Sequence, residues 1–416
     1  VDVLGIDALA LSARRDKYHL KDIKPLPRRK LLEKVPLMDC FTAPCEGGCP
    51  IRQDIPEYIE LCRKGKYTEA LATGTICAHR CQTKCTRNYY DDPVQIRATK
   101  LIAAEKGYDD LMASLKKPEP VTDGRKAAII GGGPTGIAAA YFLGRAGIPV
   151  TIFEQSHKLG GVPRLVIPGF RISEEAIEKD IALMRFYGAE VKLNTPAPSV
   201  SELKAMGYTH IFFAVGAGKA GQLDIPGNVV PVIQWLRDLK AGKDVPLGHV
   251  AVVGGGNTAM DAARAALRAG AKTSTLVYRR TKKYMPADAE ELELAVEDGV
   301  RFLELVAPVE QVNGKLKCEV MKLGDPDEKG RRSPVPTGEF TEIDCDTVIA
   351  AVGERAGSDL FTANGIEVNA KGIPEFRTNL ENVFVGGDAM RGPATVVEGI
   401  ADAQYFANAV IGSVHS

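Results

Sequence analysis

The stretch Ala127-Ala-Ile-Ile-Gly-Gly-Gly-Pro-Thr-Gly136 decides the fold. Its apolar start predicts a buried parallel strand, and Gly131, Gly133 and Gly136 fill the G-x-G-x-x-G positions of a turn into a helix. The first glycine allows a tight turn, the second lets backbone approach a pyrophosphate, and the third lets the helix pack on the strand. The helix N-terminus then offers free N–H groups and partial positive charge to phosphates. The sequence therefore predicts a dinucleotide site, and the alternative is a structural turn without a ligand.

The chain beyond this turn supplies further groups that suit a dinucleotide. A second strand, 149–154, ends in Glu154, which is placed to accept a hydrogen bond from a ribose hydroxyl. Near the C-terminus, a strand that ends in Gly387-Asp388 precedes a helix beginning near Thr395, which suits a ribityl–phosphate chain with Asp388 on a sugar-like hydroxyl. The residues predicted to contact this first nucleotide are Gly131, Gly133, Pro134, Thr135, Gly136, Glu154, Gln155, Gly160, Gly161, Val162, Gly216, Gly353, Gly387, Asp388, Thr395 and Val396.

A second fingerprint follows the apolar strand 249–253. Gly254 and Gly256 repeat the first two glycine roles, and Ala259 takes the third. The next strand ends in Arg279 and Arg280, where the first fold carries an acid. Guanidinium groups match a phosphate bidentately, so this pair predicts the 2′-phosphate of NADP rather than the bare ribose of NAD; the alternative is a solvated basic turn. The predicted contacts are Gly254, Gly256, Asn257, Thr258, Arg279 and Arg280.

The order of the segments predicts how the two folds are connected. The strand that closes the first fold, 378–388, follows the second fingerprint, so we expect the second fold to be inserted into the first. Between the motifs, the patterns predict helices over 55–64, 92–105, 174–187 and 260–269, and strands with turns over 290–345.

Length and composition narrow the class of protein. A chain of 416 residues is too long for one ordinary core, so we expect two or three domains. Lys+Arg and Asp+Glu balance at 53 each, which gives no support for a nucleic acid or an anionic membrane as partner. No uncharged apolar run approaches the roughly 18 residues of a membrane helix, and a signal-peptide pattern is absent, so we expect a cytoplasmic location. The start at Val1 is what a fragment or a processed product would show.

Seven of the nine cysteines lie between residues 40 and 85, six of them in two tight runs. The first run reads C-x4-C-x3-C-P and the second C-x3-C-x3-C, whose spacing would place it along one helical face. Thiolates hold iron–sulfur clusters, and a final Cys-Pro is typical of ferredoxin-type runs. Zinc and plain packing are the alternatives. The predicted metal ligands are Cys40, Cys45, Cys49, Cys77, Cys81 and Cys85, whereas Cys62, Cys318 and Cys345 are expected to pack as buried hydrophobes.

Together these features resemble a known family. The two cysteine runs and the segments 131–154, 254–280 and 378–388 resemble the small (β) subunit of NADPH-dependent glutamate synthase and the N-terminal half of dihydropyrimidine dehydrogenase. The stretches 39–45 and 323–332 are similar to the selenate reductase subunit branch. The resemblance implies FAD on the first fold, NADPH on the second and [4Fe-4S] clusters, one or two, in the N-terminal region.

The expected fold class is α/β, with two Rossmann-like dinucleotide-binding domains, the second inserted in the first, preceded by an α-helical iron–sulfur domain. We expect the helical iron–sulfur domain over 1–118, the FAD-binding domain over 126–235 and 346–416, and the NADPH-binding domain over 236–345.

The chain departs from the family at two cluster positions. Leu37 stands where relatives usually begin the first run with a cysteine, and Lys100 aligns with the Glu or Gln that relatives recruit as a ligand. A charged lysine cannot ligate, and six cysteines cannot fill eight positions. By analogy, one cluster would take Cys40, Cys45 and Cys85 and the other Cys49, Cys77 and Cys81, each one ligand short.

The resemblance implies an electron-input flavoprotein. NADPH would reduce the FAD, and single electrons would leave through the clusters to a larger oxidoreductase subunit or domain. No cysteine pair follows Gly160-Gly161, where a disulfide reductase carries its redox-active thiols, and no residue is assigned as an acid–base catalyst. The alternatives are a flavin reductase with structural zinc and a non-catalytic assembly subunit.

Overall fold

The computed structural model describes residues 43–71, 80–89, 92–326, 332–355 and 357–412. They divide into two compact units. The first unit holds the N-terminal chain to Pro120, the short stretch Arg145–Gly147 and the C-terminal chain from Ala394. The second unit holds Val121–Gly144 and Ile148–Pro393.

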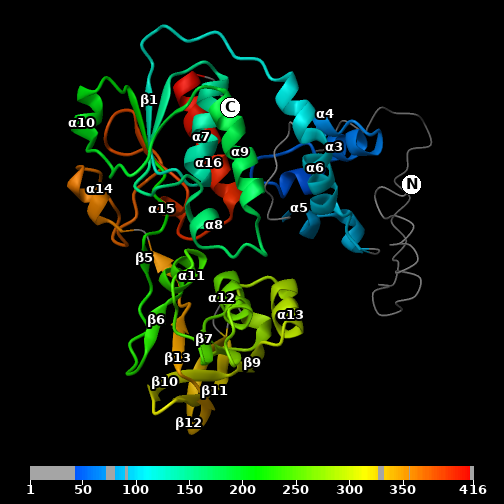
Figure 1. Cartoon of the computed structure of the whole chain (residues 1–416), viewed down its shortest axis with the longest axis vertical. Helices are drawn as coiled ribbons and strands as arrows, with labels where there is room; N and C mark the ends of the chain where they lie inside the picture. Colours follow the sequence, from blue (N-terminus) through cyan, green and yellow to red (C-terminus); the bar gives the residue numbers. More distant parts are fainter. Residues whose placement is uncertain (1–42, 72–79, 90–91, 327–331, 356, 413–416) are drawn as a thin grey trace. The chain divides into compact units, whose positions relative to one another are not determined.

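The described N-terminal part of the first unit is helical (Figure 1). Its predicted helix at 55–64 begins after Asp54, whose side chain accepts a hydrogen bond from the amide of Glu57 and so caps the helix. Tyr58 and Cys62 of this helix pack in one core with Ile96 of a long second helix. The elements of the unit are α2 (Pro44–Gly47), α3 (Ile55–Arg63), α4 (Tyr67–Leu71), α5 (Arg80–Thr83), the 3-10 helix η1 (Thr86–Tyr89), α6 (Ile96–Ser114) and, near the C-terminus, α16 (Val396–Ile411).

The first parallel sheet of the second unit is built around β1 (Ala127–Ile130). All four residues of β1 are buried, as expected for a central parallel strand. The strand order is β15-β4-β1-β2-β3, and every pair is parallel. The other elements of this fold are β2 (Val150–Phe153), β3 (Glu190–Lys192), β4 (His210–Phe213), β15 (Val383–Val385), α7 (Pro134–Arg145), α8 (Gly161–Leu165), α9 (Glu174–Phe186), α10 (Val200–Ala205), α14 (Asp359–Ala363) and α15 (Asp388–Arg391).

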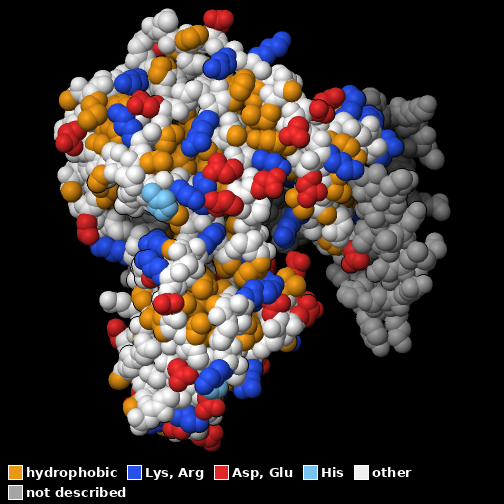
Figure 2. All heavy atoms as spheres, viewed as in Figure 1, with side chains coloured by type: hydrophobic (Ala, Val, Ile, Leu, Met, Phe, Trp, Pro, Cys, Tyr) orange, Lys and Arg blue, Asp and Glu red, His pale blue; other side chains and the backbone are white. Residues whose placement is uncertain are grey.

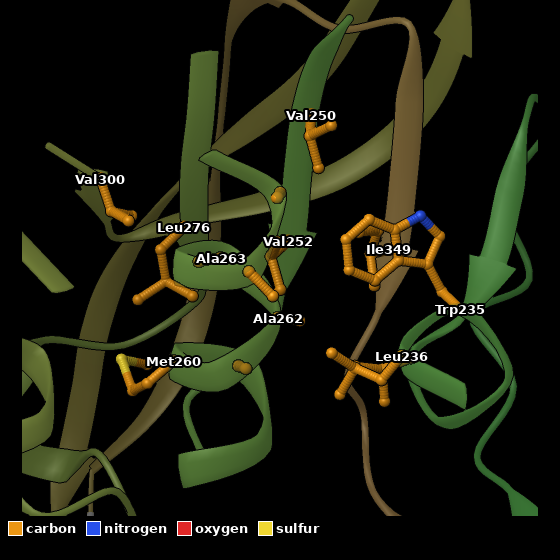
Figure 3. Close-up of a cluster of buried hydrophobic side chains, with 14 of the residues drawn as sticks. Trp235, Leu236, Val250, Val252, Met260, Ala262, Ala263, Leu276, Val300 and Ile349 are labelled. Carbon is orange, nitrogen blue, oxygen red and sulfur yellow. The ribbon is translucent and has the colours of Figure 1, made fainter. Parts of the chain in front are cut away.

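The second parallel sheet has the order β6-β13-β7-β8-β9. In its core, Trp235 and Leu236 lie near Val250, Val252 and Ile349, and small alanine side chains let one helix approach the sheet closely (Figure 3). Its elements are β6 (Val229–Pro231), β13 (Thr347–Ala350), β7 (His249–Val253), β8 (Thr273–Tyr278), β9 (Arg301–Glu304), α11 (Val232–Lys240), α12 (Asn257–Arg268), the 3-10 helix η2 (Lys282–Tyr284) and α13 (Ala289–Glu297).

The pairing of β15 establishes how the folds are connected. β15 follows the whole second sheet in the chain but pairs with β4 of the first. The second fold is therefore inserted into the first, and the predicted fold class is confirmed. The strands 229–231 and 347–350, which the sequence placed with the first fold, hydrogen-bond within the second sheet. The two crossings between the folds pair as short antiparallel strands, β5 (Lys219–Ala220) and β14 (Glu354–Arg355).

The prediction of strands over 290–345 is wrong at its start, where α13 lies instead. Glu290 and Glu291 occupy the first turn of α13, where negative charge stabilises the helix N-terminus. The rest is extended as predicted, with an antiparallel sheet of β10 (Val306–Val312), β11 (Lys315–Pro326) and β12 (Arg332–Asp344).

The distribution of charge on the surface agrees with the equal numbers of basic and acidic residues. Figure 2 shows acidic and basic side chains interspersed on the visible face of the described residues. Among the described helices, none has both the length and the apolar character needed to cross a membrane.

Two cysteines of the second unit should be chemically silent in the native protein. Cys318 and Cys345 are fully buried, and burial raises the pKa of Cys318 to about 12 and the pKa of Cys345 to about 11. Because the thiolate is the reactive form, we expect neither to be alkylated by iodoacetamide at mildly alkaline pH, and both to be alkylated after unfolding. Peptide mass mapping checks this, and alkylation of either thiol in the native protein would contradict their place in the core.

Candidate functional site

The first glycine turn is held by two contacts that leave no room for a side chain. A Cβ on Gly131, whose φ is +108°, would lie 2.4 Å from the carbonyl oxygen of Ala214. A Cβ on Gly136 would lie 1.9 Å from the carbonyl oxygen of Gly131. The chain therefore turns sharply after β1, and α7 packs directly on the turn. Pro134 and Thr135 begin α7, where the N–H groups have no helical partner.

The middle glycine of this turn faces open space. A Cβ on Gly133 would have one neighbouring residue among the described ones, Gly161, whose Cα lies 3.9 Å away. Beside it, the buried Glu154 accepts hydrogen bonds from the amide of Gly132 at 2.6 Å and from the amide of Ser156 at 2.7 Å. The predicted acid thus lies against the predicted phosphate turn, and each carboxylate oxygen keeps a lone pair for a further donor.

Two other predicted segments meet the same turn. The amide of Gly160 donates to the carbonyl oxygen of Gly132 at 2.8 Å, which brings Gly160, Gly161 and Val162 beside the glycine turn. A Cβ on Gly387 would lie 2.6 Å from Oγ1 of Thr135, so the Gly387-Asp388 turn lies at the start of α7.

The remaining predicted residues of the first nucleotide site are less closely gathered. Gln155 is exposed, one residue beyond Glu154. Gly216 and Gly353 have φ values of +72° and +103°, shortly after the ends of β4 and β13. Thr395 caps α16 through a reciprocal pair of hydrogen bonds with Glu398, and Val396 is the first residue of that helix. Thr395 and Val396 both belong to the first unit, whereas the glycine turn belongs to the second.

A carboxyl that the sequence did not single out lies near Asp388. Burial raises the pKa of Glu354 to about 6; the negative charge of Asp388 adds to this shift, and Arg237 opposes it. Glu354 belongs to β14, at the crossing between the folds. The available signal was a strand followed by glycine and an acid, the same pattern as at Gly387-Asp388.

The second glycine turn repeats the geometry of the first. A Cβ on Gly254, whose φ is +156°, would lie 2.3 Å from the carbonyl oxygen of Ala351, whereas a Cβ on Gly256 would meet nothing within 4 Å among the described residues. Ala259 takes the third position and is fully buried against the sheet. Asn257 and Thr258 then begin α12. A backbone cradle with free helical N–H groups is thus present a second time.

The two predicted arginines follow β8 at the same edge of the second sheet. Arg279 is exposed and Arg280 is half-buried. The buried Nε of Arg280 has no hydrogen-bond partner among the described residues. An unsatisfied guanidinium N–H is costly unless an acceptor binds it, so this end of β8 suits an anionic group.

Four of the six predicted cluster ligands are described, and three of them, Cys45, Cys49 and Cys81, pack in the small helical core. Cys49, Cys81 and Cys85 are buried and Cys45 is half-buried; Cys40 and Cys77 lie outside the described residues. Burial raises the pKa of the Cys45 thiol, and the neighbouring Cys85 adds to the shift. The resemblance to the glutamate synthase small subunit family likewise implies that Cys45 and Cys85 belong to the same cluster.

The second cysteine run is not one continuous helix. α5 ends at Thr83, before Cys85, because the chain turns there into η1. No group of three cysteine, histidine or acidic side chains with metal-binding geometry occurs in the described part of the chain.

Lys100 lies inside this helical core. Its side chain is buried, and its ammonium donates a hydrogen bond to the Oε1 of Gln53, also buried. It lies 5.9 Å from the ring centroid of Tyr58. A protonated amine has no lone pair to offer a metal, so this position does not fit a ligand role.

Comparison with known proteins agrees with the geometry. The pyridine nucleotide-disulphide oxidoreductase family matches residues 125–403, and dihydropyrimidine dehydrogenase domain II, a 4Fe-4S cluster domain, matches residues 36–110. The chain is 40% identical over 433 residues to the Escherichia coli protein YgfK, covering 99% of this chain but only 42% of YgfK. It is 30% identical over 425 residues to the Escherichia coli glutamate synthase [NADPH] small chain, covering 90% of this chain and 89% of that one.

The fold also matches solved structures. Mycobacterium tuberculosis FprA in complex with NADPH superposes with a TM-score of 0.59 at 20% identity, covering 69% of this chain and 84% of FprA. The two glycine turns, the inserted fold and both sequence matches lead to one assignment. The chain belongs to the pyridine nucleotide-disulphide oxidoreductase family and carries a 4Fe-4S cluster domain of the dihydropyrimidine dehydrogenase type ahead of it.

Proposed function

We propose that this chain is an electron-input flavoprotein, which takes electrons from NADPH and delivers them through its N-terminal domain to a larger oxidoreductase subunit or domain. The observation that carries this proposal is the presence, in one compact unit, of two glycine turns. Each is open at the second glycine of its fingerprint, Gly133 in the first and Gly256 in the second. One turn is matched with an acid and the other with two arginines, so the two cradles suit two different nucleotides.

The first turn suits FAD. Gly133 would leave room for a pyrophosphate beside the start of α7, where Pro134 has no N–H and the unpaired helical N–H groups begin at Thr135. Glu154 is held by two backbone amides, which fixes its carboxylate for a ribose hydroxyl. Asp388, next to Gly387 and the start of α7, is proposed to accept from a ribityl hydroxyl. The flavin-binding domain is proposed over 126–235 and 346–416 without β6 and β13, which pair in the second sheet.

The second turn suits NADPH. Gly256 leaves room for the pyrophosphate at the start of α12, and Arg279 with Arg280 is proposed to bind the 2′-phosphate. The unpartnered Nε of Arg280 supports this, because a phosphate oxygen would satisfy it. The proposed NADPH-binding domain comprises 236–345 together with β6 and β13, which pair in its sheet.

When bound, NADPH supplies a hydride, the flavin accepts it and releases single electrons, and iron–sulfur clusters conduct them onward. The residues favour this exit over disulfide chemistry, because α8 contains no cysteine and both Cys318 and Cys345 are core residues. We place the clusters in 1–118, on Cys40, Cys45, Cys49, Cys77, Cys81 and Cys85. The chain spans less than half of YgfK, so we propose that the electron acceptor is a further domain or a separate subunit. We also propose a cytoplasmic location.

An anaerobic visible spectrum of the purified protein tests this function. We expect a flavin band together with broad iron–sulfur absorbance, and we expect NADPH at low concentration to bleach both. Iron and sulfide analysis on the same sample counts the clusters.

Three other results would contradict parts of the proposal. A colourless protein would favour the assembly role. A flavin band without broad absorbance, and with zinc in place of iron, would favour a flavin reductase with structural zinc. Flavin that bleaches with dithionite but not with NADPH would remove the nicotinamide site.

The paired arginines make the coenzyme preference testable. Replacing both, Arg279→Ser with Arg280→Ser, should weaken NADPH binding by about 2–4 kcal/mol, because two charge-assisted contacts to the 2′-phosphate are lost. NADH, which lacks that phosphate, should be affected little. Flavin reduction rates with both coenzymes measure the change, and Arg332→Ser, on exposed β12, is the control for loss of surface charge. An equal loss with NADH would contradict phosphate recognition.

A further inference from the structure

A short segment, residues 160–172, runs from the first glycine turn to α12, the helix that begins at the second glycine turn. We call it the strap. It starts at the flavin-type turn, where the amide of Gly160 donates to the carbonyl oxygen of Gly132 at 2.8 Å. Gly161 follows in close backbone contact, since a Cβ there would lie 2.8 Å from the Cα of Gly133. The first end of the strap is therefore fixed to the turn itself.

The middle of the strap packs in the inserted fold, although in sequence it lies within the first fold, between β2 and β3. Val166 is buried in the same core as Trp235 and the alanines of α12. Nζ of Lys240, at the end of α11, donates to the carbonyl oxygens of Pro163, at 3.2 Å, and of Ile167. The strap therefore contacts both nucleotide folds.

The far end of the strap is clamped onto α12 and α13. Nε of Arg171 lies 2.9 Å from Oδ1 of Asp261, and its Nη1 forms an ion pair with Glu291. The ring of Phe170 lies under two arginines of α12, with its centroid 4.9 Å from Cζ of Arg264 and 4.5 Å from Cζ of Arg268. Asp261 is one helical turn beyond Asn257, the first residue of α12 at the second glycine turn.

The charges at this clamp are buried, which makes the contact specific. Asp261 and Glu291 are both 6% exposed. Burial raises the pKa of Asp261 to about 6, while Arg171 and Arg264 oppose the shift. Without Arg171 the two carboxylates keep one cationic neighbour, Arg264, whose Nη1 lies 3.8 Å from Oε2 of Glu291, but they lose their ionic link to the strap. Arg171 is thus a specific connection between the strap and the helix that begins at the second turn.

We infer that the strap sets the distance between the two nucleotide sites, and that Arg171 is a positioning residue for electron transfer between them. This inference rests on the proposed function. A hydride moves only between atoms in near contact, so a small displacement of α12 relative to the first turn lowers the rate steeply. Arg171 touches neither predicted nucleotide cradle and acts through Asp261 and Glu291.

The test compares Arg171→Met with wild type in anaerobic stopped-flow reduction by saturating NADPH. The rate of flavin reduction should fall by on the order of tenfold to a hundredfold, as expected for a misplaced reacting pair. The FAD content and the dissociation constant for NADP⁺, which binds without reacting, should stay unchanged. A merely structural role would instead lower FAD content or coenzyme affinity together with the rate.

Two further variants make the result decisive. Arg171→Lys keeps the positive charge but loses the planar fork that spans two carboxylates, so it should fold and reduce flavin at an intermediate rate. Lys315→Met removes the exposed partner of Asp344 in the same inserted fold and should react like wild type.

Besides that result, two outcomes would overturn the inference, and they are distinguishable. If NADPH reduces the wild type and both Arg171 variants are reduced as fast as the wild type, the positioning role fails and the proposed function stands. If wild type binds FAD but NADPH does not reduce it, the proposed function fails and the role of the strap fails with it.

Discussion

The contact between Gly136 and the carbonyl oxygen of Gly131 fixes where α7 begins, and the first nucleotide cradle depends on it. A side chain at Gly136 would lie 1.9 Å from that oxygen, so helix and turn approach as closely as backbone allows. The first glycine of each turn is also confined, Gly131 by the carbonyl oxygen of Ala214 and Gly254 by that of Ala351. In both places the middle glycine is left open, and free helical N–H groups face the opening.

Insertion of the second fold into the first has two consequences for the path of the chain. It lets β15 complete the first sheet after the second is finished, but the chain must then cross between the folds twice. The crossings pair only as the short strands β5 and β14. Two-residue strands resist rotation weakly, so further contacts are needed to hold the folds at one orientation. Arg171 and Val166 of the strap supply such contacts, one ionic and one apolar.

Local patterns predicted the cradles well because their chemistry is local. The strand and glycines of each cradle lie within one short stretch with the acid of the first or the arginines of the second, and the turns depend on backbone geometry that glycine reports directly. Arg171 and Glu354 were missed because their importance comes from partners distant in sequence, Asp261 and Asp388. The continuous helix expected through Cys85 failed for a related reason, since regular spacing does not reveal where a helix ends.

The cysteine domain shows how one buried side chain limits a cofactor. Lys100 is buried beside Gln53 and Tyr58, on the same face of α6 as Ile96 and Ala103, which pack in one core with Cys49 and Cys81. A protonated amine donates hydrogen bonds but offers no lone pair, so it cannot replace the carboxylate or amide ligand of relatives. Six cysteines then remain for the eight positions of two cubane clusters. Either other residues complete the two ligand sets, or one cluster is absent or holds three irons.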